Sequence, residues 1–495
     1  MDRNAIILVC VGAYMLLCMV IGLWALRSTK STHDFFMAGR NLGVIVTGVA
    51  MFSSTMSGFG FVGGPGLIYR MGMSSFWMII TAPIGFCLAY YLLAKRVRLL
   101  GELYQCISLP DVAAARYGST GVRFLVAVAI LAGVIPYLAT QIKAMALVLQ
   151  EIFAANGIWG HESLLVCVLV SSAVLVFYCV TGGIIASVYT DLFQGIVMVV
   201  VAALVFVAAL GKVDGGLAEM SRVIAADNAE AASPWGTIGM VGCLSWFLIF
   251  SVGLSGQPHL VTKLMMSRRV ADARSSLPIT LIGFSMTALL WISIGLAMRT
   301  LVLSGHHDDL ARADDAAFTF LNHYAHPVLA GLAFAGLFAA VMSTADGFLN
   351  IGAAAIVHDI PKAVTGRSLH RELVWARVAT VLLAIFAAGC AMVSPDLVGI
   401  LGAYGWGVFS AALAPAIAIG LNWKRATPTA AAASIIVSLL INGVAFGLQL
   451  TDRRIPYGVS PGTVALLASL LTFLGISLVS REPRIRRDVA AVMDI

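Results

Sequence analysis

Long apolar runs recur along the whole chain, and they constrain its fold more than any other feature. The first extends from Ile6 to Leu26. Similar runs of about 20 residues follow until close to the C-terminus, and each is long enough to cross a bilayer as a helix. Charged residues make up only 11% of the chain, whereas soluble proteins carry roughly 25%. We therefore expect an all-α polytopic protein embedded in a lipid bilayer.

The first apolar run is predicted to remain as a membrane span. It is longer than the core of a signal peptide, and no small-residue cleavage site follows it. The cysteines lie in apolar runs, apart from Cys106 in a loop, and they form no paired metal-binding spacing. We expect them to be free thiols.

The apolar runs predict thirteen spans within one transmembrane domain that covers residues 1–495. Their ranges are 5–26, 43–70, 73–94, 122–150, 163–183, 189–211, 237–262, 275–301, 327–356, 374–394, 397–421, 428–449 and 461–480. A short tail, 481–495, follows the last span.

The distribution of Lys and Arg predicts the orientation of these spans, because positive charge concentrates in cytoplasmic segments. With the N-terminus outside, the larger share of these residues lies in inner segments, and the acidic loops near 212–236 and 302–326 lie outside. We expect a cytoplasmic C-terminus and a location in a bacterial cell membrane. The net charge of +7 reflects this orientation, and no basic cluster interleaved with aromatic residues indicates a nucleic-acid partner.

Two spans are interrupted by helix-breaking residues. The stretch from Ala50 to Gly66 contains five glycines and a proline, and Ser245–His259 contains two glycines and Pro258. Broken helices at membrane depth are tolerated only where the freed backbone lines a cavity or binds something. A glycine-packed helix crossing is the alternative for the first stretch.

The two breaks lie about five spans apart. A pair of interrupted spans at matching positions in two halves is the best sequence indicator of an inverted-repeat transporter. We therefore align repeat 1, residues 43–211, with repeat 2, residues 237–421. The span at 5–26 and the two spans within 428–480 are additions to this core.

Several polar side chains lie within apolar spans, where ionisable groups usually mark a functional site. Gln141 and Lys143 are candidates to meet a substrate carboxylate, although Lys143 can also reach the outer surface or pair with an acidic residue. Asp191 can cap the sixth span or hold a cation.

The ninth span carries the adjacent hydroxyls Ser343 and Thr344, with Asp346 two residues further on. Hydroxyls alone can bond back to their own helix, but a carboxylate beside them favours a cation site. Carbonyls from a broken helix would complete an oxygen cage of the kind that hard cations prefer.

These motifs together resemble the sodium/solute symporter family, of the proline, pantothenate and monocarboxylate transporter type. The matching segments are Asp34–Gly43, Leu109–Asp111, Met56–Gly58, Gly64–Gly66, Tyr189–Gln194, Gly256–His259 and Met342–Thr344. The resemblance covers nearly the whole chain. It implies the leucine-transporter fold, with five-plus-five inverted repeats and two broken helices, and a symporter rather than an enzyme.

The resemblance also implies the cation sites. The sodium site falls on the carbonyls of Ser53, Met56 and Ala340 and on the side chains of Ser343 and Thr344. A second, more internal site would fall on Asp191, Ser343 and Asp346. Relatives with that site carry a hydroxyl where Asp346 stands, so the change favours a proton, because two nearby carboxylates ionise together only at high cost.

The predicted function is Na⁺-coupled import by alternating access of a small organic solute, a carboxylate such as a monocarboxylate, an amino acid or a pantothenate-like compound, by a functional unit of one chain. The candidate substrate residues are Ser57, Gly58, Gln141, Lys143, Phe250 and Leu254. Proline transporters carry Asp where Thr55 stands, and Trp and Tyr where Phe250 and Leu254 align. The Pro136–Ala144 run instead resembles carriers of monocarboxylates or amino acids.

Two other mechanisms remain open at this point. A proton-coupled symporter of the same fold would use Asp191 and Asp346. A channel would not accumulate its solute, and the two unwound spans argue against it. No nucleophile–base pair or metal-ligand cluster on one side of the membrane indicates an enzyme.

Overall fold

The computed structural model describes residues 2–157, 163–393, 398–449 and 455–495, and these residues fold into helices without β-strands. The helices are α1 (Arg3–Leu26), α2 (Thr32–Met37), α3 (Val44–Ser53), α4 (Gly64–Met71), α5 (Phe76–Ala89), α6 (Lys95–Leu103), α7 (Leu109–Tyr117), α8 (Thr120–Ala155), α9 (Leu164–Leu210), α10 (Gly216–Asp227), α11 (Gly239–Ser251), α12 (Pro258–Met265), α13 (Val270–Ser275), α14 (Leu277–Leu303), α15 (Ala316–His323), α16 (Pro327–Ala354), α17 (Ile360–Thr365), α18 (Glu372–Val393), α19 (Val398–Leu413), α20 (Pro428–Gln449), α21 (Pro461–Val479) and α22 (Arg487–Met493).

In the described residues, eleven helical segments are long and apolar enough to cross a membrane. The two longest of them, Gly60–Leu103 and Leu164–Leu210, each contain an internal glycine with positive φ, namely Gly72 and Gly183. Division at these glycines gives about thirteen segments in the described residues, close to the number of spans that the sequence predicts. At Gly183 (φ 53°, ψ −142°) a side chain would also collide with Phe35, so the break requires glycine.

Both predicted helix interruptions are confirmed. The first helix ends with α3 at Ser53, and helical backbone resumes at Gly58. The second ends with α11 at Ser251, passes through a short 3₁₀ turn at Gly253–Gly256, and restarts with Pro258 at the first position of α12. Proline suits that position because it donates no backbone hydrogen bond.

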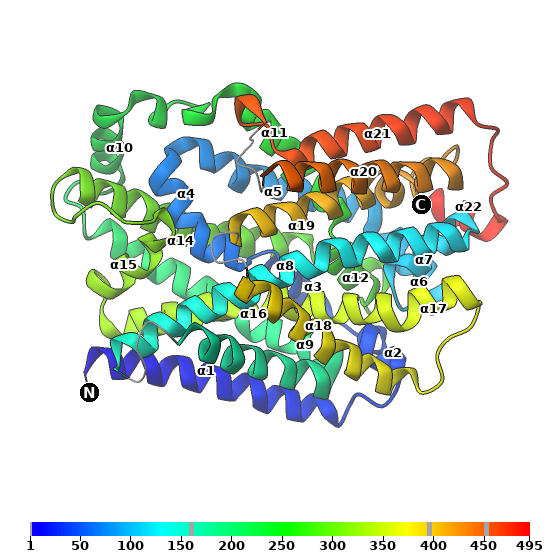
Figure 1. Ribbon diagram of the computed structural model, residues 1–495, viewed down its shortest axis with the longest axis horizontal. Helices are drawn as coiled ribbons and strands as arrows, with labels where there is room; N and C mark the ends of the chain where they lie inside the picture. Colours follow the sequence, from blue (N-terminus) through cyan, green and yellow to red (C-terminus); the bar gives the residue numbers. More distant parts are fainter. Residues whose placement is uncertain (1, 158–162, 394–397, 450–454) are drawn as a thin grey trace.

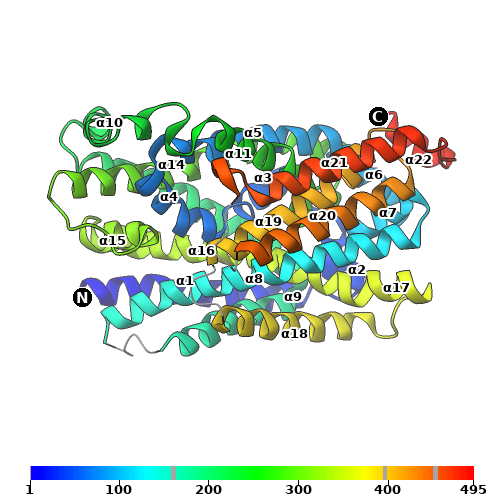
Figure 2. The same cartoon turned by 45° about the horizontal axis from the view of Figure 1, so that its top comes forward.

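Most long helices run side by side along the long axis of the molecule, and the two termini lie toward opposite ends of it (Figure 1). Helices α1, α9 and α18 form one side of the bundle, and α5, α11 and α21 form the other (Figure 2). Helix α16 lies between them and packs against α9, α1 and α8.

The exposure of each helix follows its place in the bundle. Helix α16 is buried from Ala333 to Ala354, whereas peripheral helices carry large exposed apolar residues such as Leu16, Leu440 and Leu471. An apolar outer surface of this kind suits contact with lipid. The hydroxyl and carboxyl groups of α16 are therefore at the centre of the protein.

Candidate functional site

The hydroxyls of Ser343 and Thr344 meet the end of α3 at its interruption. Oγ of Ser343 lies 2.9 Å from the carbonyl oxygen of Ser53 and 3.0 Å from that of Ala340. Oγ1 of Thr344 lies 3.1 Å from the carbonyl of Ser54. The same atom lies 3.3 Å from the carbonyl of Met56 and 3.2 Å from that of Ala340.

The structure thus brings together every residue of the predicted first sodium site. Because the chain leaves the helix after Ser53, the carbonyls of Ser54 and Met56 lie in non-helical backbone, and the carbonyl of Ser53 accepts from the N–H of Met56 at 3.1 Å. Ser54 adds a carbonyl that the sequence analysis did not assign to the sodium site. Its position directly after Ser53, within the interruption, could have indicated this role. All of these residues are buried, and a dense set of oxygens is suited to a hard monovalent cation.

Asp191 lies beside this oxygen cluster, but its partner is a lysine that the sequence analysis did not connect with it. Nζ of Lys263, in α12, lies 2.5 Å from Oδ2 of Asp191 and 3.3 Å from the carbonyl oxygen of Ala50. It also donates to Oγ of Ser54. Asp191 stands eight residues after Gly183, inside α9, so the suggestion that it caps the sixth span was wrong.

Asp346 has different hydrogen-bond partners from Asp191. Its two carboxyl oxygens accept from Tyr178 at 3.0 Å and from Ser187 at 2.7 Å, and both donors belong to α9. Asp346 is fully buried. These bonds fasten α16 to α9 and leave Asp346 within a shell of hydroxyls, close to the oxygen cluster along α16.

A cavity of about 130 Å³ lies next to the first interruption. The residues that line it are Thr55, Ser57, Gly60, Met78, Ala82, Tyr137, Trp246, Ile249, Phe250, Phe284, Trp291, Gly402, Ala403, Trp406 and Ser460. This lining contains hydroxyls and aromatic rings and no charged side chain. Its polar groups are therefore suited to orient a solute whose body is apolar.

Aromatic rings form one wall of this cavity. The ring of Phe250 lies between those of Trp246 and Trp406, with centroid distances of 6.3 and 5.4 Å. On another side, the hydroxyl of Tyr137 lies 3.2 Å from Oγ of Ser57. The sequence analysis identified Ser57 and Phe250 but not the tryptophans, which lie far apart along the chain.

The remaining candidate substrate residues lie outside the lining of this cavity. The amide N–H of Gly58 donates to Oε1 of Gln141 at 2.9 Å, so Gln141 fastens the restarted helix to α8. Leu254 is buried next to Gly85. Lys143 is buried within α8, two residues from Gln141 and therefore on a different side of the helix.

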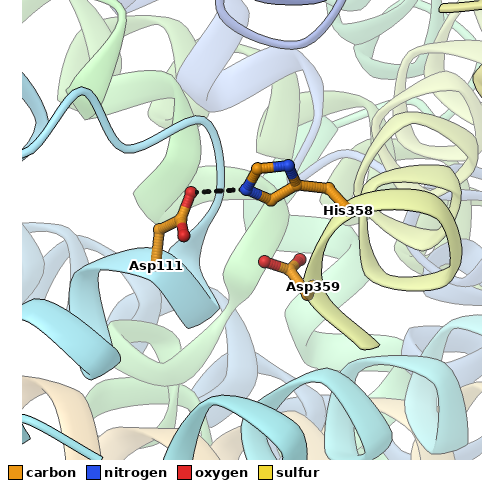
Figure 3. Close-up of side chains that lie close together, drawn as sticks. All are labelled: Asp111, His358 and Asp359. Carbon is orange, nitrogen blue, oxygen red and sulfur yellow. Dashed lines mark hydrogen bonds and ion pairs between the residues drawn. The ribbon is translucent and has the colours of Figure 1, made fainter. Parts of the chain in front are cut away.

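A second buried polar cluster lies just beyond the C-terminal end of α16, where Asp111 from α7 meets His358 and Asp359 (Figure 3). Nε2 of His358 lies 2.9 Å from Oδ2 of Asp111, and its Nδ1 lies 2.6 Å from Glu372. Asp359 accepts from Ser108 at 2.5 Å. Carboxyl and imidazole atoms of the three residues lie within 4.8 Å of one another.

This second cluster already contains its own cations. Arg123 lies 2.9 Å from Oδ1 of Asp111, and Lys362 lies 3.5 Å from the same oxygen. Burial raises the pKa of Asp111, but the hydrogen bond and charge of His358 and the charges of Arg123 and Lys362 outweigh it and lower the pKa to about 2. The cluster therefore joins α7, α8, α17, α18 and the π-helical turn Ala355–Asp359 after α16 as an ionic network.

The fold and the central site together define a class of protein, the secondary transporters, in which two interrupted helices meet at a central site. Two solved structures are similar to the chain. A Na⁺-coupled sialic acid symporter aligns with a TM-score of 0.80 and 19% identity, over 98% of this chain and 100% of the other. The nucleobase-cation-symport-1 transporter Mhp1 aligns with a TM-score of 0.59 and 14% identity, over 94% and 99%. These likenesses support the leucine-transporter fold.

The model of the sodium:solute symporter family matches residues 35–438, and the chain belongs to that family. The osmoregulated proline transporter OpuE of Bacillus subtilis is 26% identical, with 96% of this chain and 95% of the relative covered. Sodium/proline symporter 2 of Staphylococcus saprophyticus is 25% identical, with 95% and 92% covered. The chain is thus a multi-pass membrane transporter and not an enzyme.

Proposed function

We propose that this protein imports a small organic solute together with Na⁺. The observation that carries the proposal is the meeting of the Ser343 and Thr344 hydroxyls with the carbonyls of Ser53, Ser54 and Met56. Na⁺ would bind among these oxygens, with the carbonyl of Ala340 as a further ligand. Membership of the sodium:solute symporter family supports the choice of cation.

Coupling follows from where this cation would sit. Na⁺ among these oxygens joins the end of α3 to α16, and the chain that follows α3 lines the cavity through Thr55 and Ser57. An ion that orders this segment favours the state that binds solute, which is the condition for coupling. Each inward Na⁺ supplies about 2.3 kcal/mol per 100 mV from the membrane potential alone.

We propose a compact carboxylate with an apolar body as the substrate, either an amino acid or a monocarboxylate. The cavity pairs the hydroxyls of Ser57 and Tyr137 with the rings of Phe250 and Trp406. The helix that restarts at Gly58 begins beside Ser57, which lines the cavity, and the positive ends of such half-helices bind anionic substrate groups in secondary transporters. The names of the relatives make proline the first compound to test, although Thr55 departs from the proline-type pattern.

The arrangement in the membrane is also a proposal. The Lys and Arg distribution supports an N-terminus outside and a cytoplasmic C-terminus. The matched interruptions support repeats at residues 43–211 and 237–421. One chain contains the complete set of oxygens and the cavity, which supports a functional unit of one chain.

Uptake in proteoliposomes tests the proposal. The purified protein is given radiolabelled proline, pyruvate, acetate, pantothenate or other amino acids under an inward Na⁺ gradient, and in parallel under an equal K⁺ gradient. We expect one compound to accumulate only with Na⁺. Accumulation that ignores Na⁺ and follows an inward proton gradient would instead support the second candidate, a proton symporter that uses the buried carboxyl of Asp346.

A further inference from the structure

We propose that the ammonium of Lys263 is a built-in cation, which fills a second oxygen site beside Asp191 and limits the protein to one bound Na⁺. This inference rests on the proposed Na⁺ symport, because it concerns how many ions accompany the solute. It assigns to Lys263 a part in determining the stoichiometry of transport.

The first observation is the set of oxygens around Nζ of Lys263. The ammonium lies 2.5 Å from Oδ2 of Asp191 and 3.3 Å from the carbonyl oxygen of Ala50, and it donates to Oγ of Ser54. Oγ of Ser54 lies 3.0 Å from the carbonyl oxygen of Ser343 as well. The carboxylate of Asp191 in α9, the hydroxyl of Ser54 and the carbonyl of Ala50 in α3 are ligands that would suit a metal cation equally well.

The second observation is that the charges of Lys263 and Asp191 balance each other and that both side chains are buried away from water. The side chain of Lys263 is 1% exposed and that of Asp191 is 0% exposed. One positive and one negative charge balance there, so a further cation would bring a net charge into a dry site, which is costly. The ammonium thus excludes a second Na⁺ both by occupying its place and by its charge.

The third observation is an unused oxygen. Oδ1 of Asp191 is buried and has no hydrogen-bond partner in the described residues. A carboxylate normally accepts bonds at both oxygens when buried. Without Lys263, Oδ2 of Asp191 would face the space left by the ammonium, together with Ser54 and Ala50, and Oδ1 of the same carboxylate would be available as a further ligand.

Ser54 connects this filled site with the proposed Na⁺ site. Its carbonyl lies 3.1 Å from Oγ1 of Thr344, and its hydroxyl contacts Lys263 and Asp191. A single residue, Ser54, therefore contacts both the ammonium and the group of oxygens that would hold Na⁺. A smaller, neutral residue at position 263 would leave two adjacent cation sites in place of one.

Equilibrium binding of ²²Na⁺ to the purified protein counts the sites. We expect one Na⁺ per wild-type chain and two per chain of the Lys263→Ala variant. The double variant Lys263→Met/Asp191→Asn, which replaces the pair by neutral groups of similar size, is expected to bind one. In proteoliposomes, the ratio of Na⁺ to solute entering the lumen should double for Lys263→Ala and stay at the wild-type value for the double variant.

The outcomes separate this inference from the proposed function. Two Na⁺ per wild-type chain would overturn the inference and leave Na⁺ symport intact, and this measurement needs no variant. A folded Lys263→Ala protein that still binds one Na⁺ would also overturn it. Absence of saturable Na⁺ binding to the wild type would remove the proposed function, and the inference with it.

Discussion

Nζ of Lys263 lies 2.5 Å from Oδ2 of Asp191, although the two residues are 72 positions apart in the chain. The pair connects α12, the second half of an interrupted helix, with α9. Through Ala50 and Ser54 it also contacts the end of α3 and the residue that follows it. Both interrupted helices therefore meet α9 through one buried ion pair.

Loss of Asp191 and loss of Lys263 are expected to respond differently to Na⁺ when thermal stability is measured. Removal of one partner of a buried pair usually costs about 3–5 kcal/mol, because the other charge stays buried without compensation. We expect Asp191→Ala to lower the melting temperature in detergent whether or not Na⁺ is present. Lys263→Ala should recover much of its loss in Na⁺ but not in choline, because Na⁺ can replace the ammonium.

The control for this prediction is Lys263→Met/Asp191→Asn. Neutral replacement of both partners leaves no unpaired charge at this position. The melting temperature of the double variant should therefore be closer to that of the wild type than the melting temperature of either single variant is. Equal recovery of Asp191→Ala and Lys263→Ala in Na⁺ would contradict the assignment of Asp191 as the acceptor of the cation.

The aromatic wall predicts a separation between solute binding and Na⁺ binding. Phe250→Ala and Trp406→Ala remove rings from the cavity, so we expect at least about a tenfold higher solute concentration for half-maximal uptake, or roughly 1.4 kcal/mol. Binding of ²²Na⁺ without solute should not change. Phe386→Ala, in a side chain that is 58% exposed, is the control. An unchanged solute requirement in both cavity variants would argue against this cavity as the substrate site.

The ionic network around Asp111 predicts a defined pH range for one contribution to stability. The pKa of Asp111 is lowered from its usual value of 3.8 to about 2 in the folded protein. A lowered pKa stabilises the fold at pH values above the unfolded pKa, and this gain is lost as the pH falls toward the folded pKa. The melting-temperature difference between wild type and Asp111→Asn should therefore persist from pH 7 to 5 and shrink below about pH 4. A difference that disappears already between pH 7 and 5 would contradict this account.

Sequence reasoning predicted the features that are encoded within single segments. The helix breaks near Gly58 and Gly256 follow from local backbone preferences, and the adjacency of Ser343 and Thr344 places two hydroxyls at one level of α16. The resemblance to known symporters supplied the remaining step, because it connected α16 with the carbonyls of Ser53 and Met56 at the end of α3.

The features that sequence reasoning missed depend on which helices pack together. Lys263 follows the second interruption, and nothing in its local sequence indicates that it faces Asp191. The hydroxyls of Tyr178 and Ser187 reach Asp346 only because α9 packs along α16. In the same way, Trp406 joins the cavity through the packing of α19 against the short turn of the second interruption.

The central claim is that Ser343 and Thr344 hold the Na⁺ that drives import. Its most direct test is the Na⁺ concentration that gives half-maximal uptake by Ser343→Ala and Thr344→Val in proteoliposomes. The matched controls are Ser171→Ala and Thr380→Val, whose buried hydroxyls bond to carbonyls of their own helices.

We expect the required Na⁺ concentration to rise about tenfold or more in Ser343→Ala and Thr344→Val, which corresponds to roughly 1.4 kcal/mol of lost Na⁺ binding. Both controls should keep the wild-type value. A wild-type Na⁺ requirement in Ser343→Ala and Thr344→Val, measured in folded protein that still transports, would contradict the account.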